Sequence, residues 1–286
     1  MVKKLIKYDF RSYLRLLLPV QLILIGIAAI NRFIQFFEPS NNDVAKNVIG
    51  YYYAGYAGPF GVYQTIFISS IVLYVISIAV ALLMTLIVSI VRFYQGMYTN
   101  EGYLNHTLPV TPTQHIFAKL LTSLLFTFGS LFAVFLSLML ITAGDMNIEI
   151  FKAFFFILHR VFAANGIHAA LYILEGVLFV ICWCCFVYFK LYCCISIGQL
   201  VQKKKVLLAF GVFFGIYIVK QIIGTIFIIT VTLNFELMAQ IGSWIADHGI
   251  AATHIILCFG IVIDALFALI YFLITKHIMS KRLNLS

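Results

Sequence analysis

Hydrophobic residues occur along this chain in six long runs, each close to the length that crosses a lipid bilayer. A helix needs roughly 20 apolar residues to span a hydrocarbon core of about 30 Å. Because lipid offers the backbone no hydrogen-bond partners, such runs are expected to be helical. The pattern predicts an all-α, polytopic membrane protein with six transmembrane helices, over residues 16–37, 65–91, 119–143, 167–189, 206–232 and 250–274.

The composition supports this prediction and argues against a water-soluble domain. Of 286 residues, 63% are hydrophobic and 10% are charged. A soluble domain carries about 25% charged residues, which it needs to cover a water-facing surface. The sequence shows no internal repeat, low-complexity tract or linker. Residues 1–286 are therefore expected to form a single transmembrane domain.

The basic residues indicate the orientation of the chain. The net charge of +9 is not gathered on one face, as nucleic-acid binding would require, but flanks the apolar runs. Loops on the cytoplasmic side of a membrane are enriched in Lys and Arg. Most of these residues fall on one side of the membrane, including Lys3, Lys4, Lys7, Arg11, Arg15, Lys203, Lys204, Lys205, Lys276, Lys281 and Arg282. We therefore expect a multi-pass protein with both termini cytoplasmic, and no nucleic-acid partner.

Three connecting stretches are not plain loops. Residues 3–15 mix basic and apolar side chains, as an interfacial helix on the membrane surface does. Residues 148–162 are expected to form a second interfacial helix. Residues 234–249 contain Trp244 and apolar side chains, and dip back into the membrane only if protein shields their backbone.

Three ionisable residues, Glu175, Lys220 and Asp264, lie within apolar runs. An unpaired charge at the centre of a bilayer costs about 2.5–3.5 kcal/mol even on a lenient scale. Counted at a rise of 1.5 Å per residue from the outer ends, the three lie roughly 12, 18 and 21 Å deep. Lys220 is therefore expected to pair with Glu175, with Asp264 as the alternative partner. Such a pair either packs helices together or marks a polar point on a substrate path.

The remaining motifs favour no catalysis and no metal site. The sequence has no P-loop, no H-E-x-x-H and no G-x-S-x-G. Its six cysteines fit neither a zinc nor a disulfide spacing, and its seven histidines fall mostly near the ends of the runs. Gly211 and Gly215 form a G-x-x-x-G that permits close helix approach, although this spacing is common by chance. We expect no catalytic residue, no metal ligand and no cofactor in this chain.

The segment between the second and third runs is unusually polar and long. Thr111, Pro112 and Gln114 have the order of a helix start, with a capping residue, a proline at the first helical position and a glutamine that completes a capping box. Residues 94–106 are expected to form a short separate helix. A simple hairpin needs only a few residues, so this segment is expected to have a function.

This segment resembles the type-2 family of ABC export permeases. The similarity lies in Glu101-Gly102-Tyr103-Leu104, then Thr107-Leu108-Pro109-Val110, then Lys119-Leu120. The resemblance implies an elbow helix before the first span, a coupling helix between the second and third, and short re-entrant helices before the sixth. The loop before the sixth run is short here, so any re-entrant helices are abbreviated.

The resemblance further implies the membrane-spanning subunit of an ATP-driven exporter in a bacterial cell membrane. ATP and Mg would be bound by an ATP-binding cassette ATPase on a separate chain. The residues implied in coupling to it are Tyr98, Glu101, Gly102, Tyr103, Leu104, Leu108 and Pro109. A second permease copy is implied, with a homodimer favoured over a heterodimer. The aromatic-rich apolar runs favour a hydrophobic or amphipathic cargo, with a peptide favoured and a lipid or an antibiotic as the alternatives.

Two alternatives belong to other functional classes. One is a polytopic membrane enzyme that uses Glu175, Asp264 or the histidines, which requires polar residues to converge at one depth. The other is a non-transporting immunity or sensor subunit that binds an antimicrobial at its outer loops. Copurification of an ATPase argues against the enzyme, and transport into vesicles argues against the sensor.

Overall fold

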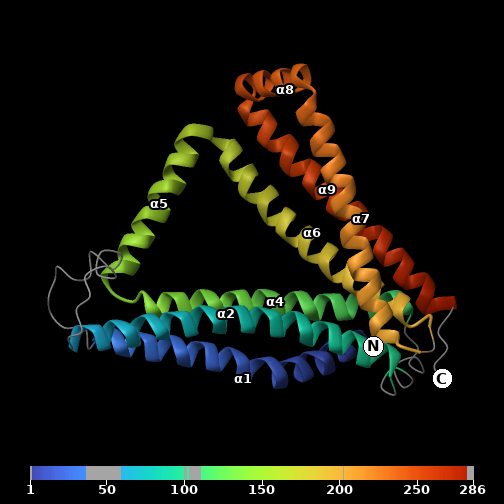
Figure 1. Ribbon diagram of the computed structural model, residues 1–286, viewed down its shortest axis with the longest axis horizontal. Coiled ribbons are helices and arrows are strands. Elements are labelled where there is room, and N and C mark those ends of the chain that lie inside the picture. Colours follow the sequence, from blue (N-terminus) through green and yellow to red (C-terminus); the bar gives the residue numbers. More distant parts are fainter. Residues whose placement is uncertain (1, 37–58, 100–101, 103–110, 202, 282–286) are drawn as a thin grey trace. The chain divides into compact units, whose positions relative to one another are not determined.

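The computed structural model describes residues 2–36, 59–99, 102, 111–201 and 203–281. All regular structure in these ranges is α-helical (Figure 1). The helices are α1 (Val2–Phe36), α2 (Pro59–Tyr98), α4 (Pro112–Ile141), α5 (Asp145–Asn165), α6 (Ile167–Gly198), α7 (Lys205–Leu233), α8 (Phe235–Asp247) and α9 (Gly249–Lys281).

Six of the described helices are long and apolar enough to cross a membrane, which confirms the predicted fold class. The candidate spans are Ile6–Phe36, Thr65–Tyr98, Pro112–Ile141, Ile167–Gly198, Lys205–Leu233 and Gly249–Ser280. They contain all six predicted runs except for residues 37, 142 and 143, and most extend well beyond them. The 40 residues of α2 correspond to about 60 Å at a rise of 1.5 Å per residue. This is about twice the thickness of the hydrocarbon core.

The N-terminal stretch differs from the expected arrangement of an elbow helix followed by a separate span. Residues 3–15 are helical, but they continue directly into the first apolar run as part of α1, which contains Pro19. The interfacial position of this stretch stays a prediction. The other two connecting stretches are helical, since α5 covers 148–162 and α8 lies within 234–249. Their depth in the membrane also stays a prediction.

The start of α4 follows the capping pattern of its sequence. Pro112 is its first residue, and the backbone N–H of Thr111 donates to the side-chain Oε1 of Gln114 at 3.2 Å. The Thr111 hydroxyl, however, contacts the Thr113 hydroxyl at 2.8 Å rather than a backbone N–H. On the other side of the connection, residues 94–98 belong to α2 and do not start a separate helix.

The chain divides into two compact units built from interleaved segments. One comprises Met1–Asp9, Ile90–Leu124 and Phe155–Ser286, and the other comprises Phe10–Ser89 and Leu125–Phe154. Because the boundaries fall inside continuous helices, the units are not two consecutive domains. The expected single transmembrane domain stays a prediction.

The unit containing Phe10–Ser89 consists mainly of α1, α2 and α4, which lie side by side (Figure 1). Leu24 and Ala28 of α1 pack against Tyr74 and Ala81 of α2. Side-chain hydrogen bonds also join the three helices. The amide of Gln21 donates to the Ser130 hydroxyl (2.8 Å), and two pairs of hydroxyls are in contact, Thr85–Ser130 (2.7 Å) and Tyr74–Ser137 (2.8 Å). Polar contacts of this kind hold membrane helices together, where lipid and side chains are equally apolar.

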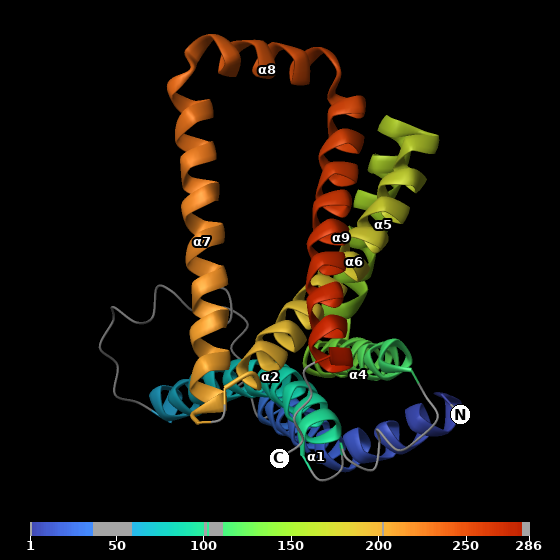
Figure 2. The same cartoon turned by 90° about the vertical axis from the view of Figure 1, so that its right-hand side faces the viewer.

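In the other unit, α6 packs against both α9 and α7, and α8 connects the ends of α7 and α9 (Figure 2). Two glycines allow the close approaches. A Cβ on Gly198 would lie 2.7 Å from the Lys205 carbonyl oxygen, and a Cβ on Gly260 would lie 2.8 Å from the Phe179 ring. By contrast, a Cβ on Gly211 or Gly215 would meet nothing within 4 Å. The G-x-x-x-G of α7 therefore makes no close contact with the part of the chain that the structure describes.

Candidate functional site

The predicted coupling residues follow the end of α2. Tyr98 is the last residue of that helix, and Gly102 is buried four residues later. The other predicted coupling residues lie outside the described part of the chain: Glu101, Tyr103, Leu104, Leu108 and Pro109.

Gly102 lies directly against the last turn of α2. Its backbone N–H donates to the Thr99 carbonyl at 2.7 Å. A Cβ at this position would lie 2.6 Å from the Met97 carbonyl oxygen, closer than two such atoms can approach. Because that neighbour is backbone and not a flexible side chain, the fold requires glycine here.

The end of α2 is attached to α6 by a hydrogen bond and by ring stacking. The Tyr98 hydroxyl donates to Ser196 Oγ at 2.7 Å, and Ser196 Oγ donates to the Tyr192 carbonyl at 2.8 Å. One turn earlier on α2, Phe93 stacks on Tyr192 with ring centroids 3.8 Å apart and planes 9° apart. The two helices are therefore fixed together directly before Gly102.

Tyr192 also connects α6 to α4. Its hydroxyl lies 2.8 Å from Ser123 Oγ and 3.3 Å from the Lys119 carbonyl oxygen, and its side chain is fully buried. We call the five residues Phe93, Tyr98, Ser123, Tyr192 and Ser196 the three-helix joint. Buried polar groups that are fully paired in this way hold one specific arrangement of helices.

An ion pair lies on α4 beside the three-helix joint. Lys119 Nζ contacts Asp9 Oδ1 at 2.5 Å, and the two side chains are 3% and 13% exposed. Loss of either partner would leave a nearly buried charge uncompensated, which is strongly destabilising. The basic start of α1 and the first turns of α4 are thereby held together.

Sequence reasoning identified Tyr98 but not the residues that hold it. Ser123, Tyr192 and Ser196 lie within apolar helices, and the only signal was that they are polar. Tyr98 is among the residues implied in coupling to an ATPase, and in the structure its hydroxyl bonds within the chain. Its role as an anchor for an ATPase stays a prediction.

The predicted pairing of the charges inside the apolar runs is wrong for Glu175. Its two carboxylate oxygens lie 2.8 and 2.9 Å from Nδ1 of His254 on α9. The Nε2 of His254 is 3.1 Å from Nδ1 of His168, and the Tyr172 ring lies 4.5 Å from the imidazole. These four residues form a polar cluster between α6 and α9, near the first residues of both helices.

Among the described residues, the positive charge of Lys220 is stabilised by an aromatic ring and not by a salt bridge to a carboxylate. Its Nζ lies 4.7 Å from the centroid of the Phe186 ring, and a cation over an aromatic face is stabilised by the charge distribution of the ring. Lys190 approaches the same ring at 5.6 Å and the Phe213 ring at 4.8 Å. Asp264 is buried on α9. No salt bridge joins Lys220 to an acid within the ranges that the structure describes.

The described residues contain no group of three or more His, Cys, Asp or Glu side chains placed to hold a metal ion. All six cysteines are free, with Cys184, Cys193 and Cys194 buried in α6. These three thiols act as small apolar side chains in the helix packing.

Comparison of the chain with protein-family models, with curated proteins and with solved structures finds no match. The class of the protein therefore follows from its own helices. Six long apolar helices, several of them joined by hydrogen bonds between polar side chains, define a multi-pass α-helical membrane protein.

Proposed function

We propose that this chain is the membrane-spanning permease subunit of an ATP-driven exporter. ATP and Mg would be bound by ATPase subunits on separate chains, which dock on the segment that resembles the export permeases. The observation that carries the proposal is the attachment of this segment. It begins just after Tyr98 and includes Gly102; Tyr98 belongs to the three-helix joint, and Gly102 lies against the last turn of α2.

This attachment suits the transmission of movement. A force applied after Gly102 acts on the end of α2, and the three-helix joint passes it to α4 and α6 through hydrogen bonds and ring stacking. Packed helices move as rigid elements and change position as a group. Closure of the ATPase pair would in this way favour one of two permease conformations, and the cargo would be released because its affinity differs between them.

The further parts of the proposal concern cargo, assembly and location. We propose a hydrophobic or amphipathic cargo, with a peptide favoured, and a homodimer of permease units in a bacterial cell membrane. Among the described helices, α7 has no buried residue, so a large apolar surface is available to lipid, cargo or a second permease copy. The distribution of Lys and Arg favours a cytoplasmic position for both termini.

Docking is tested by copurification of the ATPase. Glu101→Arg reverses a charge in the proposed docking segment, and Tyr103→Ala removes an aromatic anchor of the type that dominates interface energetics. Each variant should weaken association or make the ATPase rate insensitive to the permease, with membrane insertion unchanged. Normal assembly together with normal coupling in both variants contradicts the proposal.

Transmission through the joint is tested separately from docking. Tyr98→Phe removes one hydrogen bond and Ser196→Ala removes two, each worth about 0.5–1.5 kcal/mol, and neither changes residues 101–110. The ATPase should still copurify, but its rate should respond less to the permease. Tyr217→Phe is the matched control, because Tyr217 is exposed on α7. If the ATPase rate responds normally to the permease in both joint variants, the three-helix joint does not transmit the movement.

A further inference from the structure

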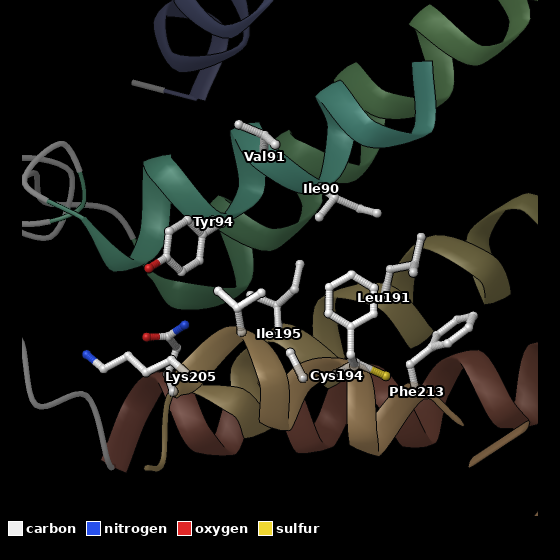
Figure 3. Close-up of a pocket in the computed structure, with 12 residues that line it drawn as sticks. Ile90, Val91, Tyr94, Leu191, Cys194, Ile195, Lys205 and Phe213 are labelled. Atoms are coloured by element: carbon white, nitrogen blue, oxygen red, sulfur yellow. The ribbon is translucent and has the colours of Figure 1, made fainter. Parts of the chain in front are cut away.

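A cleft of about 370 Å³ lies between α2, α6 and α7 in the unit that contains the three-helix joint (Figure 3). Ile90 and Val91 of α2 form one wall, Leu191 and Ile195 of α6 form a second, and Phe213 of α7 contributes to the third. The volume lies within the range of pockets that bind small ligands, about 300–1,000 Å³. Apolar walls of this kind fit a hydrocarbon chain.

Polar groups lie at one end of this cleft. Tyr94 and Lys205 line that end, whereas Leu191 and Phe213 lie towards the other (Figure 3). Gln199, at the C-cap of α6, also lines the cleft. The ligand that fits these surfaces is therefore amphipathic, with an apolar chain and a polar head.

The charge at the polar end is positive. Lys203 and Lys204 immediately precede Lys205, and both are exposed. None of these three lysines forms a salt bridge within the described ranges. They also surround the start of α7, where the helix dipole is unfavourable for a cation. This concentration of positive charge is complementary to an anionic head group.

We propose that this cleft binds an anionic phospholipid of the surrounding membrane. One acyl chain would lie between α2, α6 and α7, and the head-group phosphate would be held by Lys203, Lys204 and Lys205 beside the Tyr94 hydroxyl. The surrounding membrane is the source of the ligand because the cleft belongs to membrane-spanning helices, and basic pockets between such helices bind anionic lipid head groups. The proposal goes beyond the permease function and does not rest on it.

Binding at this position would stabilise one corner of the unit. Close contact between α6 and α7 depends on Gly198, since a Cβ there would meet Lys205 and Ala209. A lipid that touches both helices and α2 would hold this contact in place. A ligand that binds only the folded state raises the unfolding temperature, so the lipid should act as a measurable stabiliser.

The test compares two lipids on the purified full-length chain in neutral detergent. Phosphatidylglycerol and phosphatidylcholine with identical acyl chains are added, and thermal unfolding is followed. Phosphatidylglycerol at saturating concentration should raise the unfolding temperature by roughly 5 °C, and phosphatidylcholine should raise it much less. Equal shifts from the two lipids overturn head-group recognition. An equal shift from inorganic phosphate alone overturns the lipid assignment.

Substitutions then locate the site. Lys203→Gln, Lys204→Gln and Lys205→Gln in combination should remove the response to phosphatidylglycerol, whereas Lys152→Gln with Lys276→Gln should retain it. Val206→Trp fills the cleft from α7 and should also remove the response. Leu207→Trp is its control, because Leu207 is 65% exposed and does not line the cleft.

A full response in either the lysine variant or Val206→Trp overturns the assignment to this cleft. If the lysine variant fails to fold, Val206→Trp and its control decide the location. In either case, the comparison of the two lipids on the unsubstituted chain decides whether the protein recognises an anionic head group.

Discussion

At the scale of single residues, the contact between Glu175 and His254 determines how a substitution in the apolar core acts. The two side chains are 17% and 20% exposed, and they connect α6 to α9. A carboxylate in such surroundings is stabilised by the hydrogen bond that the imidazole donates. Removal of the imidazole leaves the acid without its principal partner.

We therefore expect His254→Ala to destabilise the protein by about 1–3 kcal/mol, the cost of an unsatisfied polar group with little exposure. Adding Glu175→Gln should recover part of the loss, because the stranded charge is then gone. The measurement is a double-mutant cycle on thermal unfolding in detergent. The Glu175 and His254 substitutions should show a coupling energy of at least about 0.5 kcal/mol.

Lys220→Met combined with Glu175→Gln provides the control for this cycle. In the structure Lys220 lies over the Phe186 ring and not against Glu175, so these two changes should be additive. Strong coupling between Lys220 and Glu175, with none between His254 and Glu175, would restore the pairing expected from depth alone.

The presence of ionisable groups within the spans was predictable from the sequence, but the partner of Glu175 was not. Depth along a helix follows from residue number, because each residue rises 1.5 Å. The direction in which a side chain points follows from amphipathic periodicity, and helices that are apolar on all sides have almost none. His254 and Lys220 were therefore both compatible with Glu175 until the packing of α9 on α6 selected the histidine.

At the scale of elements, the contact between α6 and α7 depends on the absence of one side chain. We expect Gly198→Ala to lower the unfolding temperature, because the added Cβ would lie 2.7 Å from the Lys205 carbonyl and 2.8 Å from the Ala209 Cβ. Overpacking of this kind costs about 1–3 kcal/mol. Thermal unfolding of the purified chain measures it.

Gly211→Ala and Gly215→Ala are matched controls on the neighbouring helix. An added Cβ meets no atom of the described residues within 4 Å at either position, and alanine favours a helix over glycine by about 1 kcal/mol. Both variants should be neutral or slightly more stable. Greater damage from Gly211→Ala than from Gly198→Ala would show that the G-x-x-x-G makes the important contact, with a partner outside this chain.

The helices themselves were the most predictable part of the fold. Apolar runs fix their number and approximate positions, since only a helix satisfies the backbone in lipid. Capping residues also placed the start of α4 at Pro112. Hydropathy alone did not give the ends of α2 and α6, because these helices extend past the apolar runs into sequence that includes Tyr98 and Ser196. Those extensions contain most of the three-helix joint.

At the scale of the whole molecule, the distribution of basic residues predicts which parts face the cytoplasm. In a cysteine-free background within intact cells, Asp145→Cys and Ala246→Cys should react with a membrane-impermeant reagent added outside. Lys203→Cys should not react until the membrane is opened. Labelling of Lys203→Cys in intact cells, with protection of the other two, would reverse the proposed orientation.

The pairing of α6 with α9 also has a consequence for synthesis of the protein. Glu175 and His254 are 79 residues apart, and a ribosome adds about 5–20 residues per second. Roughly 4–16 seconds therefore pass between the synthesis of the two residues. During this interval α7 and α8 are made, and neither supplies the imidazole that Glu175 contacts in the finished protein. Glu175 of α6 is therefore without its histidine partner in the nascent chain until α9 has been synthesised.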